Sequence, residues 1–87
     1  MPKKSVIHYA EVCPVCHCGI VGFIRLQNSD VAMCCDECDA SWNTPGEIEE
    51  SSCGFREYTP ADVWANLAEI EAVGWTMYVN GTYRDPA

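Results

Sequence analysis

Basic residues are scarce in this sequence. Lys and Arg together number five, against thirteen Asp and Glu, so the formal net charge is −8 at pH 7. The five are also scattered, at Lys3, Lys4, Arg25, Arg56 and Arg84. Because nucleic-acid binding draws its affinity from Lys and Arg that neutralise phosphates, we expect no nucleic-acid partner. An acidic surface favours solubility, and it also suits a basic protein partner.

Long apolar runs are missing as well. No stretch approaches the roughly 18 apolar residues of a membrane helix, so we expect no membrane partner. The opening residues, MPKKSVIHYAEV, contain only short apolar pieces and lack the apolar region of about 7–15 residues that a secretory signal needs. We therefore expect a cytoplasmic location, where disulfides are rare and clustered thiols more often bind metal.

Signatures of catalysis are also absent. Ser, His and Asp form no recognisable nucleophile pattern, and the chain has no glycine-rich phosphate-binding loop. A thioredoxin-type activity would need a Cys-x2-Cys pair at a helix N-terminus within a βαβ unit. The residues around the cysteine pairs of this chain favour strands instead. We expect no enzymatic activity.

The length limits the core. We predict that the 87 residues form one domain, 1–87, and such a chain buries only about 60–65% of the surface that its unfolded form exposes. A structural zinc can contribute an apparent ~10–16 kcal/mol to folding, which is comparable to the whole net stability of a domain. A bound metal is therefore an expected source of stability.

Cysteine, by contrast, is abundant, with seven residues. The pairs Cys13-Pro-Val-Cys16 and Cys35-Asp-Glu-Cys38 enclose eighteen residues, within the 15–20-residue window typical of zinc sites. The short spacer lets both sulfurs of a pair reach one ion at about 2.3 Å, and two pairs complete a tetrahedron. The predicted ligands of one Zn²⁺ are Cys13, Cys16, Cys35 and Cys38, with iron as the alternative metal. Four thiolates close the coordination shell, which predicts a structural site.

Other uses of these thiols remain open, namely buried packing and a disulfide framework. Cys34 would face away from Cys35 on a strand and is expected to pack in the core. Cys18 could replace Cys16 as a ligand, and Cys53 or His17 could substitute for a cysteine. A second metal site built from the remaining cysteines and a histidine has no support from the spacing.

The secondary-structure signals divide the chain into parts. Residues 5–12 favour an edge strand, and 19–27 and 31–35 favour a hairpin around Asn28-Ser29-Asp30, whose side chains suit a turn. Each arm of that hairpin carries a Cys-x2-Cys pair near its outer end. The hairpin therefore brings the two pairs together within a zinc-binding half, 5–45.

The second half begins with an irregular connection, 46–58, with one turn of helix near PGEIEE. A helix is predicted over 59–74, where Thr59 can cap the start and Gly74 can end it. Its apolar face should cover the sheet. Asn80-Gly81 then suits the turn of a terminal hairpin. The predicted fold is a small α+β domain with zinc-ribbon hairpins, one C-terminal helix and a short terminal β-hairpin over 59–87.

The motifs CPVC and CDEC, joined by a hairpin and followed by Trp42, resemble the zinc-ribbon family with a rubredoxin-like four-cysteine site over about residues 10–45. The resemblance implies that Cys13, Cys16, Cys35 and Cys38 hold a metal that supports a small sheet. In rubredoxins the metal is iron and the task is electron transfer. Members place Gly after the second cysteine of a pair, where this chain has His17 and Asp39.

These observations predict a non-enzymatic zinc-binding protein that acts as a protein–protein interaction module. A narrower version is an acidic inhibitor or immunity-type protein that masks a basic enzyme. The alternatives are a rubredoxin-like iron protein and a nucleic-acid-binding ribbon, which the charge disfavours. Aromatic residues, enriched at interface anchors but also common in cores, are available for binding: Trp42, Trp64, Trp75, Tyr78 and Tyr83.

Overall fold

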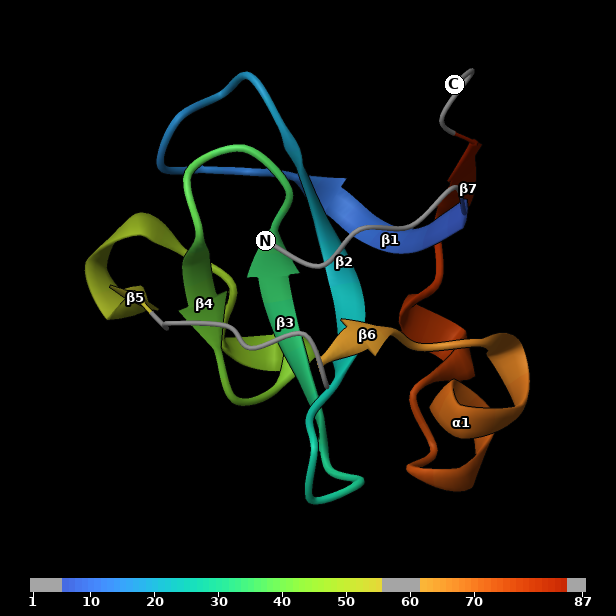
Figure 1. Ribbon diagram of the computed structural model, residues 1–87. Helices are drawn as coiled ribbons and strands as arrows, with labels where there is room; N and C mark the ends of the chain where they lie inside the picture. Colours follow the sequence, from blue (N-terminus) through green and yellow to red (C-terminus); the bar gives the residue numbers. More distant parts are fainter. Residues whose placement is uncertain (1–5, 56–61, 85–87) are drawn as a thin grey trace.

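A computed structural model describes residues 6–55 and 62–84 of the chain (Figure 1). In these residues, seven strands form one sheet in the order β5-β4-β3-β2-β1-β7, and β6 pairs with β2 beside this path. All the pairings are antiparallel. The strands are β1 (Val6–Val12), β2 (Ile20–Arg25), β3 (Val31–Cys35), β4 (Ala40–Trp42), β5 (Gly54–Phe55), β6 (Val63–Trp64) and β7 (Gly81–Arg84).

Helical structure is short in the described residues. The one α-helix there is α1 (Leu67–Ala72), and three 3₁₀ turns accompany it: η1 (Pro45–Glu47), η2 (Glu50–Ser52) and η3 (Thr76–Tyr78). No helix in this part of the chain is long and apolar enough to cross a membrane. The predicted class is therefore confirmed: a small, mostly antiparallel β protein with a short helix near its C-terminal end.

The β2–β3 hairpin forms where the sequence predicts it. Ser29 adopts a left-handed φ of 74°, and the Leu26 amide donates to the Asp30 carbonyl at 2.8 Å. The Asn28 side chain accepts from the Asp30 amide at 3.1 Å, which is the local bond expected of a turn asparagine. The turn therefore sets the register of the two central strands.

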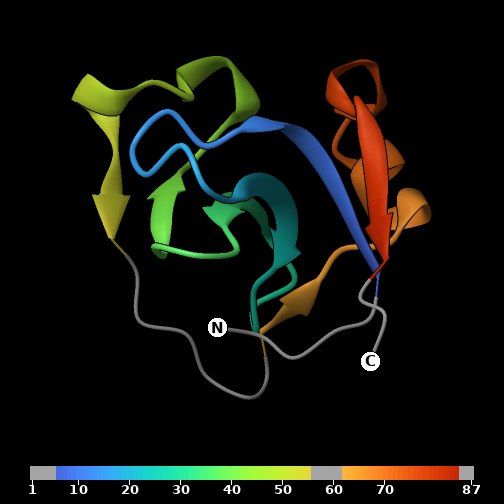
Figure 2. The same cartoon turned by 90° about the horizontal axis from the view of Figure 1, so that it is seen from above.

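Apolar side chains cover both faces of this hairpin. Because side chains alternate along a strand, Phe23 and Met33 face one core cluster and Ile24 and Ala32 face the other. The first cluster also includes Cys13, Val21, Cys35, Trp42, Ala65 and Ile70, and the second includes Ile7, Cys34 and Trp64. β3 is buried along its whole length. Figure 2 shows segments on both sides of this central pair, with β4 and β5 on one side and α1 and β7 on the other.

The first strand is not at an edge. β1 lies between β2 and β7, and its pairing with β2 is irregular between Tyr9 and Glu11. After Gly22, the partner of β2 on this edge changes from β1 to β6, and Trp64 lies opposite Ile24. A Cβ at Gly22 would lie 2.6 Å from Ile7 and 2.9 Å from Trp64. The absence of a side chain at Gly22 therefore lets these two large residues close over β2.

The terminal strand β7 forms after Asn80-Gly81 as predicted, but its partner differs. Residues 76–78 form η3, and β7 pairs with β1, where Ile7 lies opposite Tyr83. The Asn80 amide donates to the Tyr9 carbonyl at 2.9 Å and brings the chain to this edge. Four residue pairs with the longer β1 replace the expected local hairpin.

The helix begins later than predicted. Residues 59–61 lie outside the described residues, and Val63 and Trp64 form β6 instead of helix. Asn66 starts α1 through a capping box with Glu69, while Gly74 ends the segment with a φ of 76°, as expected. Trp64 is buried in the second core cluster, and this contact outweighs the helical pattern of the sequence.

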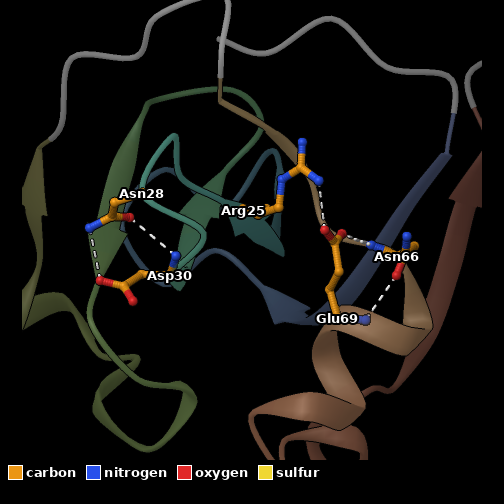
Figure 3. A network of polar contacts seen from close by, with 5 residues as sticks. All are labelled: Arg25, Asn28, Asp30, Asn66 and Glu69. Atoms are coloured by element: carbon orange, nitrogen blue, oxygen red, sulfur yellow. Dashed lines mark hydrogen bonds and ion pairs between the residues drawn. The ribbon is translucent and has the colours of Figure 1, made fainter.

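A polar network fastens α1 to the sheet (Figure 3). The Arg25 guanidinium, at the end of β2, donates to the Glu69 carboxylate at 2.8 Å. The other oxygen of Glu69 accepts from the Asn66 amide at 2.9 Å, and the Asn66 side chain accepts from the Glu69 amide at 2.8 Å. One carboxylate thus serves both the helix cap and the contact with β2.

Candidate metal centre

The structure brings together the four cysteines that the spacing selects. Cys13 and Cys16 lie in the loop between β1 and β2, and Cys35 and Cys38 lie at the end of β3 and in the turn to β4. Their sulfur atoms all lie within 4.8 Å of one another. Figure 1 shows the two loops at the same end of the sheet. The hairpin therefore joins pairs that are distant in sequence.

The distances suit one tetrahedral ion. The sulfurs of Cys13 and Cys38 lie 3.7 Å apart, and so do those of Cys16 and Cys35. A tetrahedron of metal–sulfur bonds of about 2.3 Å has edges of about 3.8 Å. The four thiols thus form a group able to hold a single metal ion.

Backbone amides are directed at the sulfurs in the same way in both pairs. The Val15 amide donates to Cys13 Sγ at 3.4 Å, and the Glu37 amide donates to Cys35 Sγ at 3.3 Å. In each case the donor is two residues after the first cysteine. In a metal-bound state these amide donors would stabilise the negative charge on the two coordinating sulfurs.

The residue after each second cysteine also adopts matching geometry. His17 has a φ of 58° and Asp39 a φ of 61°, so both occupy the left-handed region. The zinc-ribbon resemblance implies Gly here, and His and Asp belong to the residue types that enter this region most readily after Gly. The backbones of the two turns are therefore alike, although His17 and Asp39 stand where the resemblance implies Gly.

The pKa values of three of these thiols are shifted. Amide donors, Cys18 first and then Gly19, lower the pKa of Cys16 to about 7 from an ordinary 9.0. Burial raises the pKa of Cys35 strongly, and burial also raises the pKa of Cys38. A bound cation would offset the cost of burying these charges, since a coordinating thiol is deprotonated by the ion.

Two contacts that the sequence did not indicate hold the loops in place. Asp36 Oδ1 accepts from the Ile20 amide at 2.9 Å, and the Asp36 amide donates to the Ile20 carbonyl at 3.1 Å. A Cβ at Gly19 would lie 2.9 Å from Cys35 Sγ, so the first loop can approach the second only without a side chain there. An aspartate next to a ligand cysteine is too common a pattern to have predicted this bond.

The remaining cysteines take other positions. Cys34 is fully buried in the second core cluster, on the face opposite Cys35, as predicted. Cys18 is exposed and Cys53 is half-buried against the first cluster, and neither joins the group of four. His17 is exposed and also lies outside it. Within the described residues, no second group of three or more potential ligands occurs.

The four thiols differ in their exposure to solvent. Cys13 and Cys35 are fully buried and belong to the first core cluster, while Cys16 and Cys38 are partly exposed. An ion held between them would therefore join the core to the surface loops. Comparisons with protein-family models, with curated proteins and with solved structures found no match for this chain. The likeness to zinc ribbons rests on the cysteine cluster and its place on the sheet.

Proposed function

We propose that this protein is a non-enzymatic metal protein that binds one Zn²⁺ structurally and acts by binding another, basic protein. The observation that carries the metal assignment is the convergence of four cysteine sulfurs within 4.8 Å. Four thiolates leave no open position for a substrate, and a catalytic zinc normally keeps one. The site therefore supports the fold.

The role that best suits the site is to stabilise the fold. The ion would tie the loop before β2 to the turn after β3, and two of its ligands lie inside the first core cluster. A structural zinc contributes an apparent ~10–16 kcal/mol, which is of the order of the net stability of a small domain. Folding of this chain should therefore depend on the metal, in a reducing compartment such as the cytoplasm.

Iron is the second candidate metal, because a tetrahedral group of four cysteine sulfurs also suits a single iron ion. The geometry of the two cysteine pairs supports iron as well as it supports zinc. Ferric tetrathiolate is strongly coloured and zinc is not. A colourless protein that contains zinc after expression in iron-replete cells would exclude the electron-transfer role.

The charge distribution supports a basic protein partner. No Lys or Arg occurs between Arg25 and Arg56, while that stretch contains Asp30, Asp36, Glu37, Asp39, Glu47, Glu49 and Glu50. Glu47, Glu49 and Glu50 lie together on the η1–η2 segment, outside the core. With four thiolates and a divalent ion, the net charge becomes about −10. Such a surface speeds association with a basic partner. An inhibitor that masks a basic enzyme would be one example of this interaction.

The metal assignment is tested by elemental analysis of the untagged protein together with chelator-dependent unfolding. We expect one zinc per chain and loss of far-UV circular dichroism when a strong chelator removes it. Cys16→Ser should lower zinc content and stability, whereas Cys18→Ser, two residues away and exposed, should change neither. A reduced, folded chain without metal would refute the assignment.

The partner assignment is tested by affinity capture from cells at low ionic strength. The wild type is compared with a variant in which Glu47, Glu49 and Glu50 are changed to Gln, and captured proteins are identified by mass spectrometry. We expect a specific basic protein to be lost from the variant and from the wild type at high salt. Unchanged capture by the variant would argue against an electrostatic partner at this surface.

A further inference from the structure

A groove of about 410 Å³ lies at the end of the sheet where β2 turns into β3. Its walls come from three separate segments: Leu26, Asp30 and Val31 from the hairpin, Asn43 after β4, and Val73 and Trp75 after α1. The metal centre is at the opposite end of β2 and β3. The groove is therefore separate from the cysteine cluster, and its volume is within the range of small ligand sites.

Apolar side chains and one carboxylate line the groove, together with the side-chain amides of Asn28 and Asn43. Val31 is buried, Val73 is 40% exposed, and the half-buried Trp75 packs its ring against Phe23 at a centroid distance of 6.5 Å. Asp30 is exposed at the hairpin tip. An aromatic ring held in place by the core, aliphatic side chains and a carboxylate together suit a long side chain that ends in a cation.

The charge of Asp30 is not matched by a cation of the described residues. One of its oxygens accepts from the Asn28 side chain at 2.9 Å. The nearest basic residue in sequence, Arg25, is directed to Glu69 and away from Asp30 (Figure 3). The second carboxylate oxygen of Asp30 has no side-chain partner among the described residues, so it is available to a donor from outside.

We propose that this groove binds an arginine side chain of the partner protein, with the guanidinium on Asp30 and Trp75 and the aliphatic stem on Val31 and Val73. Arginine is preferred over lysine because its planar group stacks on indole and pairs with a carboxylate through two donors. The proposal rests on the function proposed above and names its anchoring contact. A second copy of this chain fits less well, since both copies carry a formal charge of −8.

The test uses the metal-loaded protein and three short peptides, Ac-Ala-X-Ala-NH₂, in which X is arginine, lysine or citrulline. Citrulline has the shape of arginine without its charge. Binding is followed by ¹H–¹⁵N chemical shifts at low ionic strength. We expect the arginine peptide to shift the Trp75 indole and the Asn43 side-chain amide, the lysine peptide to bind less tightly, and the citrulline peptide to give no saturable shift.

Two matched variants isolate the groove. Asp30→Asn should raise the Kd of the arginine peptide about 3- to 10-fold, as expected for loss of a charge-assisted contact near the surface. Glu11→Gln makes the same charge change on β1, near the other end of β2, and should leave the Kd unaltered. Equal binding by citrulline, or an equal Kd for Asp30→Asn, would overturn the proposal.

Other outcomes separate this proposal from the function on which it rests. Shifts confined to the η1–η2 segment would overturn the groove and leave an acidic binding surface in place. No binding of the arginine peptide, with a basic partner still captured from cells, would have the same meaning. Shifts of Trp75 that appear on raising the protein concentration alone would assign the groove to a second copy and overturn the arginine assignment.

Discussion

His17 and Asp39 show how single residues shape the cysteine turns. Each follows the second cysteine of its pair and adopts a left-handed φ, of 58° and 61°. For a residue with a Cβ this conformation costs about 1–2 kcal/mol. Asp39 has in addition a buried carboxylate oxygen that lacks a hydrogen-bond partner in the described structure. Both positions therefore carry a local cost that the rest of the fold offsets.

Replacing His17 by glycine should stabilise the protein. Glycine removes the cost of the left-handed φ, and its greater freedom in the unfolded chain offsets about 0.5–1 kcal/mol of that gain. A net gain of about 0.5–1 kcal/mol would raise Tm by a few degrees in a chain of this size. Calorimetry of the metal-loaded protein measures this. His17→Ala removes the same exposed imidazole but keeps the backbone cost, so an equal gain with alanine would refute the explanation.

The two thiols Cys16 and Cys35 should differ in reactivity when the metal is absent. Amide donors hold the pKa of Cys16 at about 7, below its ordinary value, while burial raises that of Cys35. Because the thiolate is the nucleophile, alkylation of Cys16 should accelerate as pH rises through about 7 and then level off. Cys35 should remain unreactive over this range.

Iodoacetamide labelling with peptide mapping across pH measures this difference in the metal-free protein. In denaturant, both thiols should react with the pH dependence of an ordinary cysteine. Labelling of Cys16 that begins only above the ordinary pKa would contradict the assigned role of the amide donors. Bound zinc should suppress labelling of both thiols.

At the scale of elements, α1 depends on contacts outside its own sequence. The helix has six residues, which is too short to be stable alone. It is held by the buried Ile70, by the capping box of Asn66 and Glu69, and by the ion pair with Arg25. The cap therefore decides where the helix begins, at a point well inside the predicted range of 59–74.

Loss of this cap should destabilise the protein measurably. Asn66→Ala removes the acceptor for the Glu69 amide and should lower the free energy of unfolding by about 1 kcal/mol. Asn66→Asp keeps an acceptor and should cost much less. Urea unfolding of the metal-loaded protein distinguishes the two. Equal stability of the alanine variant and the wild type would mean that the packing of Ile70 and the Arg25–Glu69 ion pair hold the helix without the cap.

At the scale of the whole molecule, the chain must fold despite strong self-repulsion. Its formal charge of −8 lies on a small body with a radius of gyration of 11.5 Å. Like charges at such separations repel one another, and salt screens this repulsion over a Debye length of about 10 Å at 0.1 M. Within the described residues, the ion pair between Arg25 and Glu69 contributes an attraction that opposes this repulsion.

Added KCl should therefore raise the Tm of the metal-loaded protein. The reason is that screening removes more repulsion from the compact folded state than from the expanded unfolded chain. The variant in which Glu47, Glu49 and Glu50 are changed to Gln should show a smaller rise. A thermal melt series at constant pH measures both. A Tm that falls with salt would show that local attractive pairs outweigh the net charge.

The sequence alone was sufficient for the features that depend on neighbouring residues. The spacing within each cysteine pair and the Asn-Ser-Asp turn are local, and together they led to the hairpin and to the four thiols that the structure groups. The opposite orientations of Cys34 and Cys35 follow from the period of a strand in the same way. Short-range geometry is set by neighbouring residues, so these predictions did not depend on the rest of the fold.

Tertiary structure alone decided the features that depend on distant partners. Val63 and Trp64 fit a helical pattern, yet they pair with β2 because Trp64 finds a buried place above Gly22. β7 pairs with β1 instead of forming a local hairpin, and the groove at Asp30 and Trp75 exists only because three segments meet there. The hydrophobic period of a sequence indicates which side chains are buried, but not which residues they pack against. Those packing partners are set by the tertiary structure.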